Sequence, residues 1–309
     1  MFKAARDRPV VVVGAANMDV VGLASTSRVP GDSTPGQLVL SAGGVARNVA
    51  HVLAQLGTAV DLVSVVGHDV FGSQVIRSTA GAGVNTQAVQ VLAGSRTASY
   101  LGLLEPDGSL VWAVNDMQIL ESLTPQRLAQ EQQRLQNAAG WVLDCNLTDS
   151  TLAWLFGQAR SCPVAVDGVS AAKVGRVAPW LGQIDLLKIN RLEAAALTGL
   201  ALDSVGQALL AAEALRAKGV AQVLITLGAW GAGWCDTQGR TGYLPVAPGP
   251  ASGLAGTNNN NNGAGDALFA GLLAALGRGA NFETAMACAM VCAAHARAGL
   301  DIDRATISP

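Results

Sequence analysis

Short runs of β-branched and other apolar residues alternate along the chain with amphipathic or alanine-rich stretches. The clearest runs are PVVVVGAAN from Pro9, WVLDCN from Trp141 and QVLITLG from Gln222. Continuous apolar runs of this length predict strands that helices cover on both faces, as in a parallel sheet. We therefore expect an α/β fold with a doubly wound, mainly parallel sheet flanked by helices, and PVVVVGAAN as its first strand.

One region breaks this alternation. The segment TASYLGLLEPDGSLVWAVNDM, residues 97–117, contains two strand-like runs joined by a Pro-Asp-Gly turn, which predicts a hairpin without a crossover helix. Residues 20–40 are rich in Gly, Pro, Ser and Thr and belong with this hairpin. We expect a small β-sheet lid formed by about residues 20–42 and 95–116, because lids exclude water and complete sites.

Composition narrows the choice of partners. The chain has 309 residues, of which 14% are charged, and its net charge is −2 without any window rich in Lys and Arg. The chain therefore lacks the basic surface that a nucleic-acid binder needs, and we expect a small-molecule partner. No apolar run is long enough for a membrane span or a signal peptide, and the first run soon meets Asn17 and Asp19. We expect a soluble, cytoplasmic protein.

The five cysteines contain no C-x-x-C pair, so neither a disulfide framework nor a zinc site is indicated. Cys288 and Cys292 lie one helical turn apart in an alanine-rich helix. That spacing suits a metal, but we interpret both as packing residues.

The segment SAGGVARNVAHVLAQLG places Gly43 and Gly44 before a helical apolar pattern. Two interpretations stay open: the glycines form a tight turn into the helix, or they let a ligand approach the backbone while Asn48 faces the same space.

The segment GAANMDV places Asn17 and Asp19 at the end of the predicted first strand, on one side of it. Ligands of open α/β sheets bind at the carboxyl ends of strands, and a carboxylate there can accept two hydrogen bonds from a sugar diol. A helix cap or turn residue is the alternative interpretation.

The segment LLKINRLEAAALTG predicts a strand that ends at Lys188 and a helix that Asn190 caps, with Glu193 at the third helical position. This arrangement is close to a capping box. An amide and a carboxylate at the end of a strand also suit water-mediated contact with Mg²⁺ and phosphate oxygens.

The segment NGAGDALFAG begins an apolar helix with Gly263, Ala264 and Gly265, whose backbone N–H groups can bind an anion. Asp266 would then face a bound phosphoryl group. The alternative is that Asp266 only stabilises the helix dipole.

The motifs NMD, GG, NRLE, TLGAWG and GAGD follow one another along the chain. In order and spacing they resemble those of the ribokinase-like (PfkB) family of carbohydrate and nucleoside kinases, over nearly the whole chain. The segments GGVARNVA, AVNDMQI, VLDCN, VDGVSAAK and LKINRLEAAALTG are most similar to the pseudouridine kinases of that family. The resemblance implies a single ribokinase-like kinase domain over residues 1–309 that transfers phosphate from ATP to the 5′-hydroxyl of pseudouridine.

The same resemblance implies roles for individual residues. Asp266 would be the general base, and the backbone N–H groups of Gly263, Ala264 and Gly265 would form an anion hole. The residues expected to bind the acceptor are Asn17, Asp19, Gly43, Gly44, Asn48, Asn115 and Asp116. Those expected at the ATP site are Lys188, Asn190, Thr226, Gly228 and Gly231, with Glu193 holding Mg²⁺ through water.

Relatives often use a monovalent cation such as K⁺, and they often form homodimers through the lid, where SYLGLL would supply an apolar edge. Two other functions stay open from the sequence. One is a kinase for another nucleoside or sugar, and the other is a catalytically weak nucleoside- or nucleotide-binding sensor.

Five consecutive asparagines, Asn258 to Asn262, stand directly before GAGD, where relatives have a strand that usually ends in threonine. Asparagine is a poor strand former, and only eight others occur in the rest of the chain. The run represents unidentified residues, an engineered replacement or a divergent loop. Our hypothesis is that these letters do not report the true residues, and an intact mass that matches the written sequence would contradict it. Ile189 and Gly168 are lesser departures, since relatives favour proline at both positions.

Overall fold

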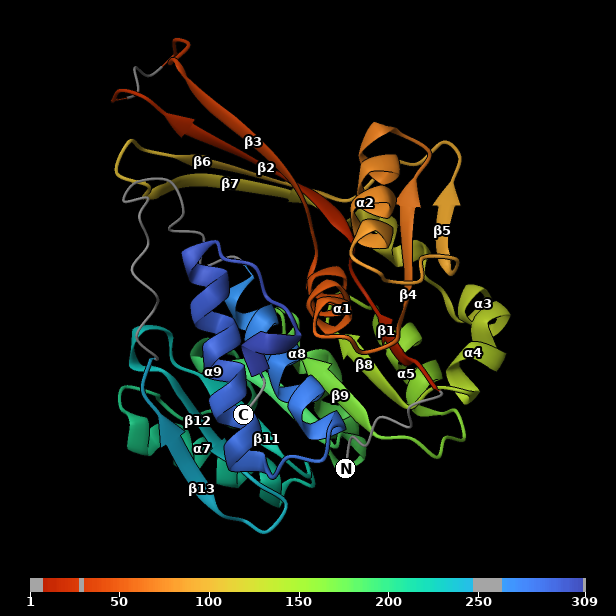
Figure 1. Cartoon of the computed structure of the whole chain (residues 1–309), viewed down its shortest axis with the longest axis vertical. Coiled ribbons are helices and arrows are strands. Elements are labelled where there is room, and N and C mark those ends of the chain that lie inside the picture. The colour runs from red at the N-terminus through yellow and green to blue at the C-terminus, as the bar shows by residue number, and fades with distance from the viewer. Residues whose placement is uncertain (1–7, 28–30, 247–262, 308–309) are drawn as a thin grey trace.

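The structure is a computed structural model that describes residues 8–27, 31–246 and 263–307 (Figure 1). Its large sheet contains β1 (Val10–Val13), β4 (Val60–Gly67), β5 (Val89–Leu92), β8 (Gly140–Asp144), β9 (Val164–Asp167), β10 (Leu186–Asn190), β11 (Val223–Thr226), β12 (Ala232–Cys235) and β13 (Thr241–Leu244). Its small sheet contains β2 (Asn17–Ala24), β3 (Gly36–Gly43), β6 (Ser99–Leu104) and β7 (Leu110–Asp116). The α-helices are α1 (Val45–Gln55), α2 (Val70–Gly81), α3 (Pro125–Leu128), α4 (Gln132–Gln136), α5 (Asp149–Phe156), α6 (Arg191–Thr198), α7 (Val205–Ala217), α8 (Ala264–Gly277) and α9 (Phe282–Ala298).

The large sheet has the strand order β13-β12-β11-β10-β9-β8-β1-β4-β5. Its pairs are parallel except those that β12 and β13 make at one edge. Alternation along β1 puts Val10 and Val12 in one hydrophobic layer and Val11 and Val13 in the other. Helices α1, α8 and α9 contribute to the first layer, and α5, α6 and α7 to the second, so both faces are covered (Figure 1). The predicted doubly wound, mainly parallel sheet is confirmed.

The small sheet has the order β3-β2-β6-β7 and stands beside the carboxyl ends of the large sheet (Figure 1). The hairpin that links β6 and β7 turns at Pro106, Asp107 and Gly108, where the Gly108 N–H donates to the Glu105 carbonyl at 2.8 Å. This confirms the predicted hairpin without a crossover helix.

The placement of Asn17 and Asp19 at the end of the first strand was wrong. Strand β1 ends at Val13, and both residues belong to β2 of the small sheet. A side chain at Gly14 would lie 2.4 Å from the Asp144 carboxylate, so the chain passes close to β8 before it enters the second sheet. Ala15 and Ala16 are buried and apolar, which is why the sequence reads as one continuous strand.

Two other expectations concern the helices. Cys292 is buried between α8 and α9, where a side chain on Gly271 would lie 2.8 Å from its Sγ, as the packing interpretation predicts. Within the described ranges, no helix combines the length and apolar character that crossing a membrane requires. The asparagine run lies outside the described residues.

Candidate active site

The carboxyl ends of four neighbouring strands meet at one edge of the large sheet. Asp144 pairs with Asp167 across β8 and β9, and Asn190 pairs with Thr226 across β10 and β11. The first turns of α1 and α8 and the base of β2 lie near this edge. Ligands of open α/β sheets bind here, so the arrangement defines the candidate site.

The Asp19 carboxylate lies where β2 meets β3. The Asn17 side-chain amide donates to Asp19 Oδ1 at 2.6 Å. Gly43 lies beside the same carboxylate, because a side chain there would come within 2.2 Å of Asp19 Oδ2. Burial raises the pKa of Asp19, whereas the Asn17 hydrogen bond and the Arg47 charge lower it. Because Gly43 has no side chain, there is room for the Asp19 carboxylate, a hydrogen-bond acceptor that is only partly exposed.

Gly44 has a different reason to be glycine. Its φ is 97°, and a side chain there would lie 2.4 Å from the Ala15 carbonyl. The tight-turn interpretation therefore explains Gly44, whereas Gly43 makes space for the Asp19 side chain.

Asp266 lies in the first turn of α8 with only 8% of its surface exposed. The Asn48 side-chain amide on α1 donates to Asp266 Oδ2 at 2.9 Å. Burial raises the pKa of Asp266 to about 7, against the lowering effect of the Lys188 charge. A carboxylate with a pKa near neutrality suits a general base.

Among the described residues, the N-terminus of α8 has no side-chain cap. Gly263 is the N-cap residue, with φ 97°, and it brings no side-chain acceptor to the first-turn N–H groups. These N–H groups and the helix dipole therefore favour an anion next to Asp266.

Lys188 lies beneath this helix start and is buried. Its Nζ donates to Asp167 Oδ2 at 2.8 Å, and a side chain on Gly265 would lie 3.1 Å from the same Nζ. Burial lowers the pKa of Lys188, but the charges of Asp167 and Asp266 raise it above its ordinary value. The site therefore keeps a fixed positive charge beside the candidate anion hole.

Asn190 and Glu193 form the predicted capping box. Asn190 Oδ1 accepts from the N–H groups of Leu192 and Glu193, and Glu193 Oε2 accepts from the Asn190 N–H at 2.8 Å. Glu193 Oε1 accepts from the Asn190 side-chain amide. A carboxylate has about four acceptor sites, so capacity for water remains. Asn190 and Glu193 therefore fit a hydrated Mg²⁺ that they hold through water. Among the described residues, no group of three Asp, Glu, His or Cys side chains could bind a metal ion directly.

Gly168 makes this geometry possible, because a side chain there would lie 2.6 Å from Glu193 Oε2. Gly168, where we expected proline from the resemblance, therefore leaves the Glu193 carboxylate in place.

The turn after β11 contains Thr226, Gly228 and Gly231. Gly228 has φ 61°, and a side chain on Gly231 would lie 2.1 Å from the Leu244 carbonyl, so both glycines meet backbone requirements. A cleft of about 550 Å³ adjoins this turn. Its lining residues are Asp203, Ser204, Val205, Ala229, Trp230, Tyr243, Pro245 and Val246.

Asn115 and Asp116 lie on opposite faces of the small sheet. Asp19 pairs with Tyr100, which pairs with Asn115, so these three side chains share one face. Asp116 lies on the other face and forms an ion pair with Arg96 at 3.5 Å. The structure brings Asn115 into line with Asp19 and does not bring Asp116 there.

Sequence reasoning missed Asp144 and Asp167. Asp144 accepts hydrogen bonds from the backbone N–H groups of Ala15, Ala46 and Asn146 at 2.8, 3.1 and 2.9 Å. It thereby ties the end of β1 and the start of α1 to β8. The available signal was a lone acid directly after each apolar run, in VLDCN and in PVAVDG.

We expect Asp144→Ala to lower the free energy of unfolding by about 3 kcal/mol, because two buried N–H groups and one half-buried N–H group lose their acceptor. Asp149→Ala is the control, since that side chain is 83% exposed and its loss should cost only about 0.5 kcal/mol. Denaturant unfolding measures both, and equal effects would contradict the role given to Asp144.

Comparison with known proteins adds three findings. The model of the pfkB family carbohydrate kinases matches residues 7–299. The chain is 38% identical over 298 residues to the uncharacterized sugar kinase YeiI of Escherichia coli, covering 96% of this chain and 80% of YeiI. It is 37% identical over 289 residues to the pseudouridine kinase of Escherichia coli, covering 93% of this chain and 90% of that kinase.

Among solved structures, an Arabidopsis thaliana ribokinase complexed with ribose and ATP superposes with a TM-score of 0.82 at 22% identity, over 97% of both chains. The fold is therefore ribokinase-like, with a large mostly parallel sheet and a small second sheet. The family uses ATP to phosphorylate a hydroxyl group. The chain belongs to the pfkB family of carbohydrate kinases and is a phosphotransferase with a hydroxyl acceptor.

Proposed function

We propose that the protein phosphorylates the 5′-hydroxyl of pseudouridine with ATP and releases pseudouridine 5′-phosphate and ADP. The observation that carries the proposal is the hydrogen bond between Asn48 and Asp266, which joins the candidate base to the helix that starts just after Gly43, beside Asp19. The likeness to the pseudouridine kinase of Escherichia coli supports the acceptor. A comparable likeness to an uncharacterized sugar kinase supports a kinase for another nucleoside or sugar as the alternative.

In the proposed mechanism, the Asp19 carboxylate accepts hydrogen bonds from the ribosyl hydroxyls, with Asn17, Asn48 and the glycine turn around it. Asn115 extends the same face of the small sheet toward the base, and the small sheet acts as the lid. Asp116 has no part in this mechanism, because its side chain lies on the other face of the small sheet.

Residues at the start of α8 carry out the chemical step. The Asp266 carboxylate accepts the 5′-hydroxyl proton while that oxygen bonds to the γ-phosphorus and the bond from phosphorus to the β–γ bridging oxygen breaks. The backbone N–H groups of Gly263, Ala264 and Gly265 stabilise the transferring phosphoryl group, and the Lys188 charge adds to this stabilisation. Apart from the two substrates, the groups in this step belong to the start of α8 and the end of β10, at one edge of the large sheet.

ATP would bind along the remaining strand ends, at Lys188, Asn190, Thr226, Gly228 and Gly231. Glu193 would hold Mg²⁺ through water, and the ion would supply charge neutralisation for the phosphates. K⁺ dependence stays a prediction to which we assign no residue.

The test is a panel of acceptors, namely pseudouridine, uridine, inosine, ribose and fructose, each with ATP and Mg²⁺. We expect pseudouridine to have the highest kcat/KM. If another acceptor is phosphorylated fastest, the family assignment stands and the pseudouridine proposal is wrong. Binding of nucleoside without any turnover would instead support the sensor.

The pH dependence follows from Asp266. The base acts as a carboxylate, and burial raises its pKa to about 7, so protonation removes it below that pH. We expect kcat/KM for the acceptor to fall about tenfold per pH unit below pH 7 and to level off above it. A profile that is flat between about pH 5 and 8 would show that this carboxylate is not the base.

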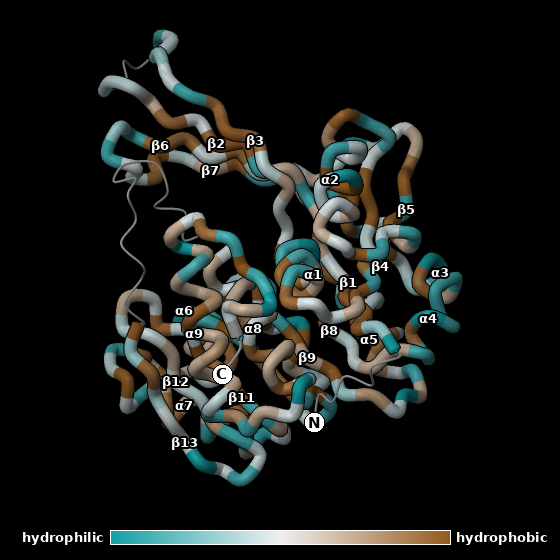
Figure 2. Tube along the Cα trace, in the orientation of Figure 1, coloured by the Kyte–Doolittle hydropathy of each residue, from teal (hydrophilic) through white to brown (hydrophobic). Residues whose placement is uncertain are grey.

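We further propose that two copies associate through the small sheet. The large apolar side chains on the face opposite Asp19 are exposed, with Leu38 73% and Trp112 71% exposed. Figure 2 shows the hydrophobic colour along β2, β3 and β6 at this place. The other members of this face are Leu40, Leu101, Leu103 and Val114.

Sedimentation of Trp112→Glu tests the dimer. We expect the unmodified chain to sediment as a dimer and the variant as a monomer, because a charge would be buried in an apolar contact. Leu210→Glu is the matched control, since Leu210 is 59% exposed on α7. A monomeric unmodified chain, or a variant that still dimerises, contradicts the proposal.

A further inference from the structure

Arg47 on α1 is buried, with 6% of its surface exposed. An arginine has five N–H donors, and each one of Arg47 has a partner. Those partners are Thr79 Oγ1 at 3.0 Å, the Ala42 carbonyl at 3.2 Å, Asn48 Oδ1 at 3.3 Å, His51 Nδ1 at 3.0 Å and Ser78 Oγ at 2.8 Å. Arg47 therefore has no donor left for a substrate, and any role it has must act through another residue.

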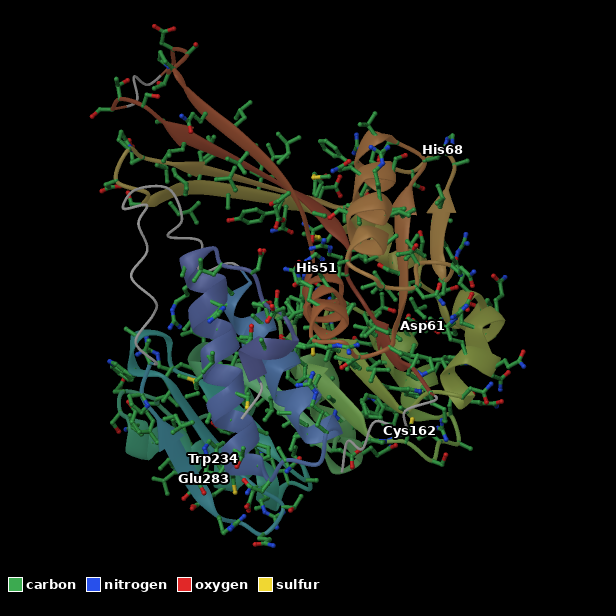
Figure 3. The ribbon with its side chains drawn as sticks, in the orientation of Figure 1. His51, Asp61, His68, Cys162, Trp234 and Glu283 are labelled. Atoms are coloured by element: carbon green, nitrogen blue, oxygen red, sulfur yellow. The ribbon has the colours of Figure 1, made fainter. Side chains whose placement is uncertain are left out.

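The partners of Arg47 are neutral. The guanidinium can only donate, so His51 Nδ1 must be its acceptor, and burial together with the Arg47 charge lowers the pKa of His51 to about 4. Figure 3 shows His51 on α1, below the place where the small sheet begins. Among the described residues, no carboxylate lies within ion-pair distance of Arg47. The structure thus keeps a buried cation here without a direct counter-ion.

The hydrogen bond to Asn48 has a specific consequence. An asparagine side chain has an oxygen that accepts and a nitrogen that donates, on opposite sides. Because Asn48 Oδ1 accepts from Arg47, Asn48 Nδ2 is left to donate to Asp266 Oδ2 at 2.9 Å. The reversed amide would place its oxygen against the Asp266 carboxylate and its N–H groups against the guanidinium, so both contacts would become repulsive.

Arg47 is itself anchored by α2. Ser78 and Thr79 hold two of its nitrogens, and Thr79 in turn donates to the Val75 carbonyl at 2.7 Å. The guanidinium therefore cannot follow Asn48 if the amide turns. A fixed donor of this kind sets the orientation of its neighbour.

We propose that Arg47 is a positioning residue that fixes the amide of Asn48, so that Asn48 holds the Asp266 carboxylate in the orientation that receives the acceptor hydroxyl proton. This inference rests on the proposed role of Asp266 and adds a residue that makes no contact with either substrate. Its effect on kcat should pass through Asn48, whereas the loss of its charge near Asp19 should appear in acceptor binding.

A double-mutant cycle tests that path. We expect Arg47→Met and Asn48→Ala each to lower kcat about 10- to 100-fold, and the double variant to be within about twofold of Asn48→Ala alone. Losses that multiply would overturn the proposal, because an Arg47 that only supports the fold would act independently of Asn48. Turnover is measured with whichever acceptor the unmodified enzyme uses best, so a different acceptor defeats the pseudouridine proposal and leaves this test intact.

Two measurements distinguish a positioning role of Arg47 from a role in the stability of the fold. The charged or titratable groups that face Asp266 are Lys188 from β10, Asp167 from β9 and Asp144 from β8, and Asn48 of α1 is the one donor whose orientation Arg47 sets. In Arg47→Met the acidic limb of the kcat profile should move to higher pH, since Asn48 no longer favours the ionised carboxylate. The side-chain amide signals of Asn48 in a ¹H–¹⁵N spectrum should also lose their protection from hydrogen exchange, which needs no turnover at all.

Arg134→Met is the matched control. Arg134 pairs with Asp61, whose neighbours Val60 and Leu62 face the layer of α1, so Asp61 lies on the opposite face of the sheet from His51, which Figure 3 labels separately. That variant should therefore lose stability and keep its pH profile. If Arg47→Met does not fold, Ser78→Ala with Thr79→Val releases the guanidinium from α2 while keeping its charge. That pair should reproduce the shift of the acidic limb, and an unchanged limb would overturn the proposal.

Discussion

Asp266→Asn is expected to lower kcat about 10³-fold while acceptor and ATP binding change by less than about threefold. The substitution keeps the size of the side chain, but an amide cannot accept the hydroxyl proton. Asp266 is buried and hydrogen-bonded to Asn48, so the variant should retain its place in α8. Steady-state turnover and calorimetric binding of the acceptor give the two quantities separately.

Asp301→Asn is the matched control, because Asp301 is exposed after the end of α9 and should leave kcat unchanged. If Asp266→Asn keeps more than about a tenth of the turnover, Asp266 only stabilises the helix dipole, as the alternative interpretation from the sequence holds. If turnover and acceptor binding fall together, Asp266 acts mainly in binding.

Asp19→Ala is expected to raise the dissociation constant of the acceptor about 100-fold and to leave that of ATP unchanged. Two charge-assisted hydrogen bonds from a ribosyl diol to the carboxylate are worth about 3 kcal/mol net, which corresponds to that factor. Asp19 belongs to the small sheet and the β11 turn to the large sheet, so we expect the dissociation constant of ATP to be unaffected. Calorimetric titration with each ligand measures both constants.

Deoxy acceptors supply the control for Asp19. The unmodified enzyme should bind the 2′-deoxy analogue of its acceptor at least about tenfold more weakly, and Asp19→Ala should bind both about equally. If the variant still distinguishes them as well as the unmodified enzyme does, the diol is bound elsewhere.

The large sheet could be predicted because its strands are continuous apolar runs and its helices carry separate apolar patterns. The hairpin of β6 and β7 could be predicted from Pro106, Asp107 and Gly108, which specify a turn locally. The place where β1 ends could not, since Ala15 and Ala16 continue the apolar run and the strand ends where Gly14 and Ala15 contact Asp144 of β8.

The motifs of the site could be predicted from the sequence, but the contacts between their side chains could not. Residues 48 and 266 come together only when α1 packs on α8, and no local pattern shows that contact. Strand alternation predicts that Asn115 and Asp116 face opposite ways. Which of the two shares a face with Asp19 is set by the pairing of β2, β6 and β7, which the sequence does not show. Asp144 and Asp167 were missed because a single acid after a strand resembles an ordinary turn residue.

We propose that this pfkB kinase phosphorylates the 5′-hydroxyl of pseudouridine through Asp266. The most direct measurement incubates protein of verified mass with ATP, Mg²⁺ and pseudouridine, identifies the product by phosphorus NMR, and repeats the reaction with Asp266→Asn. We expect a phosphate coupled to the 5′ protons and a rate that falls about 10³-fold in the variant. Phosphate on another hydroxyl, no phosphorylated nucleoside, or a variant as fast as the unmodified enzyme would contradict it.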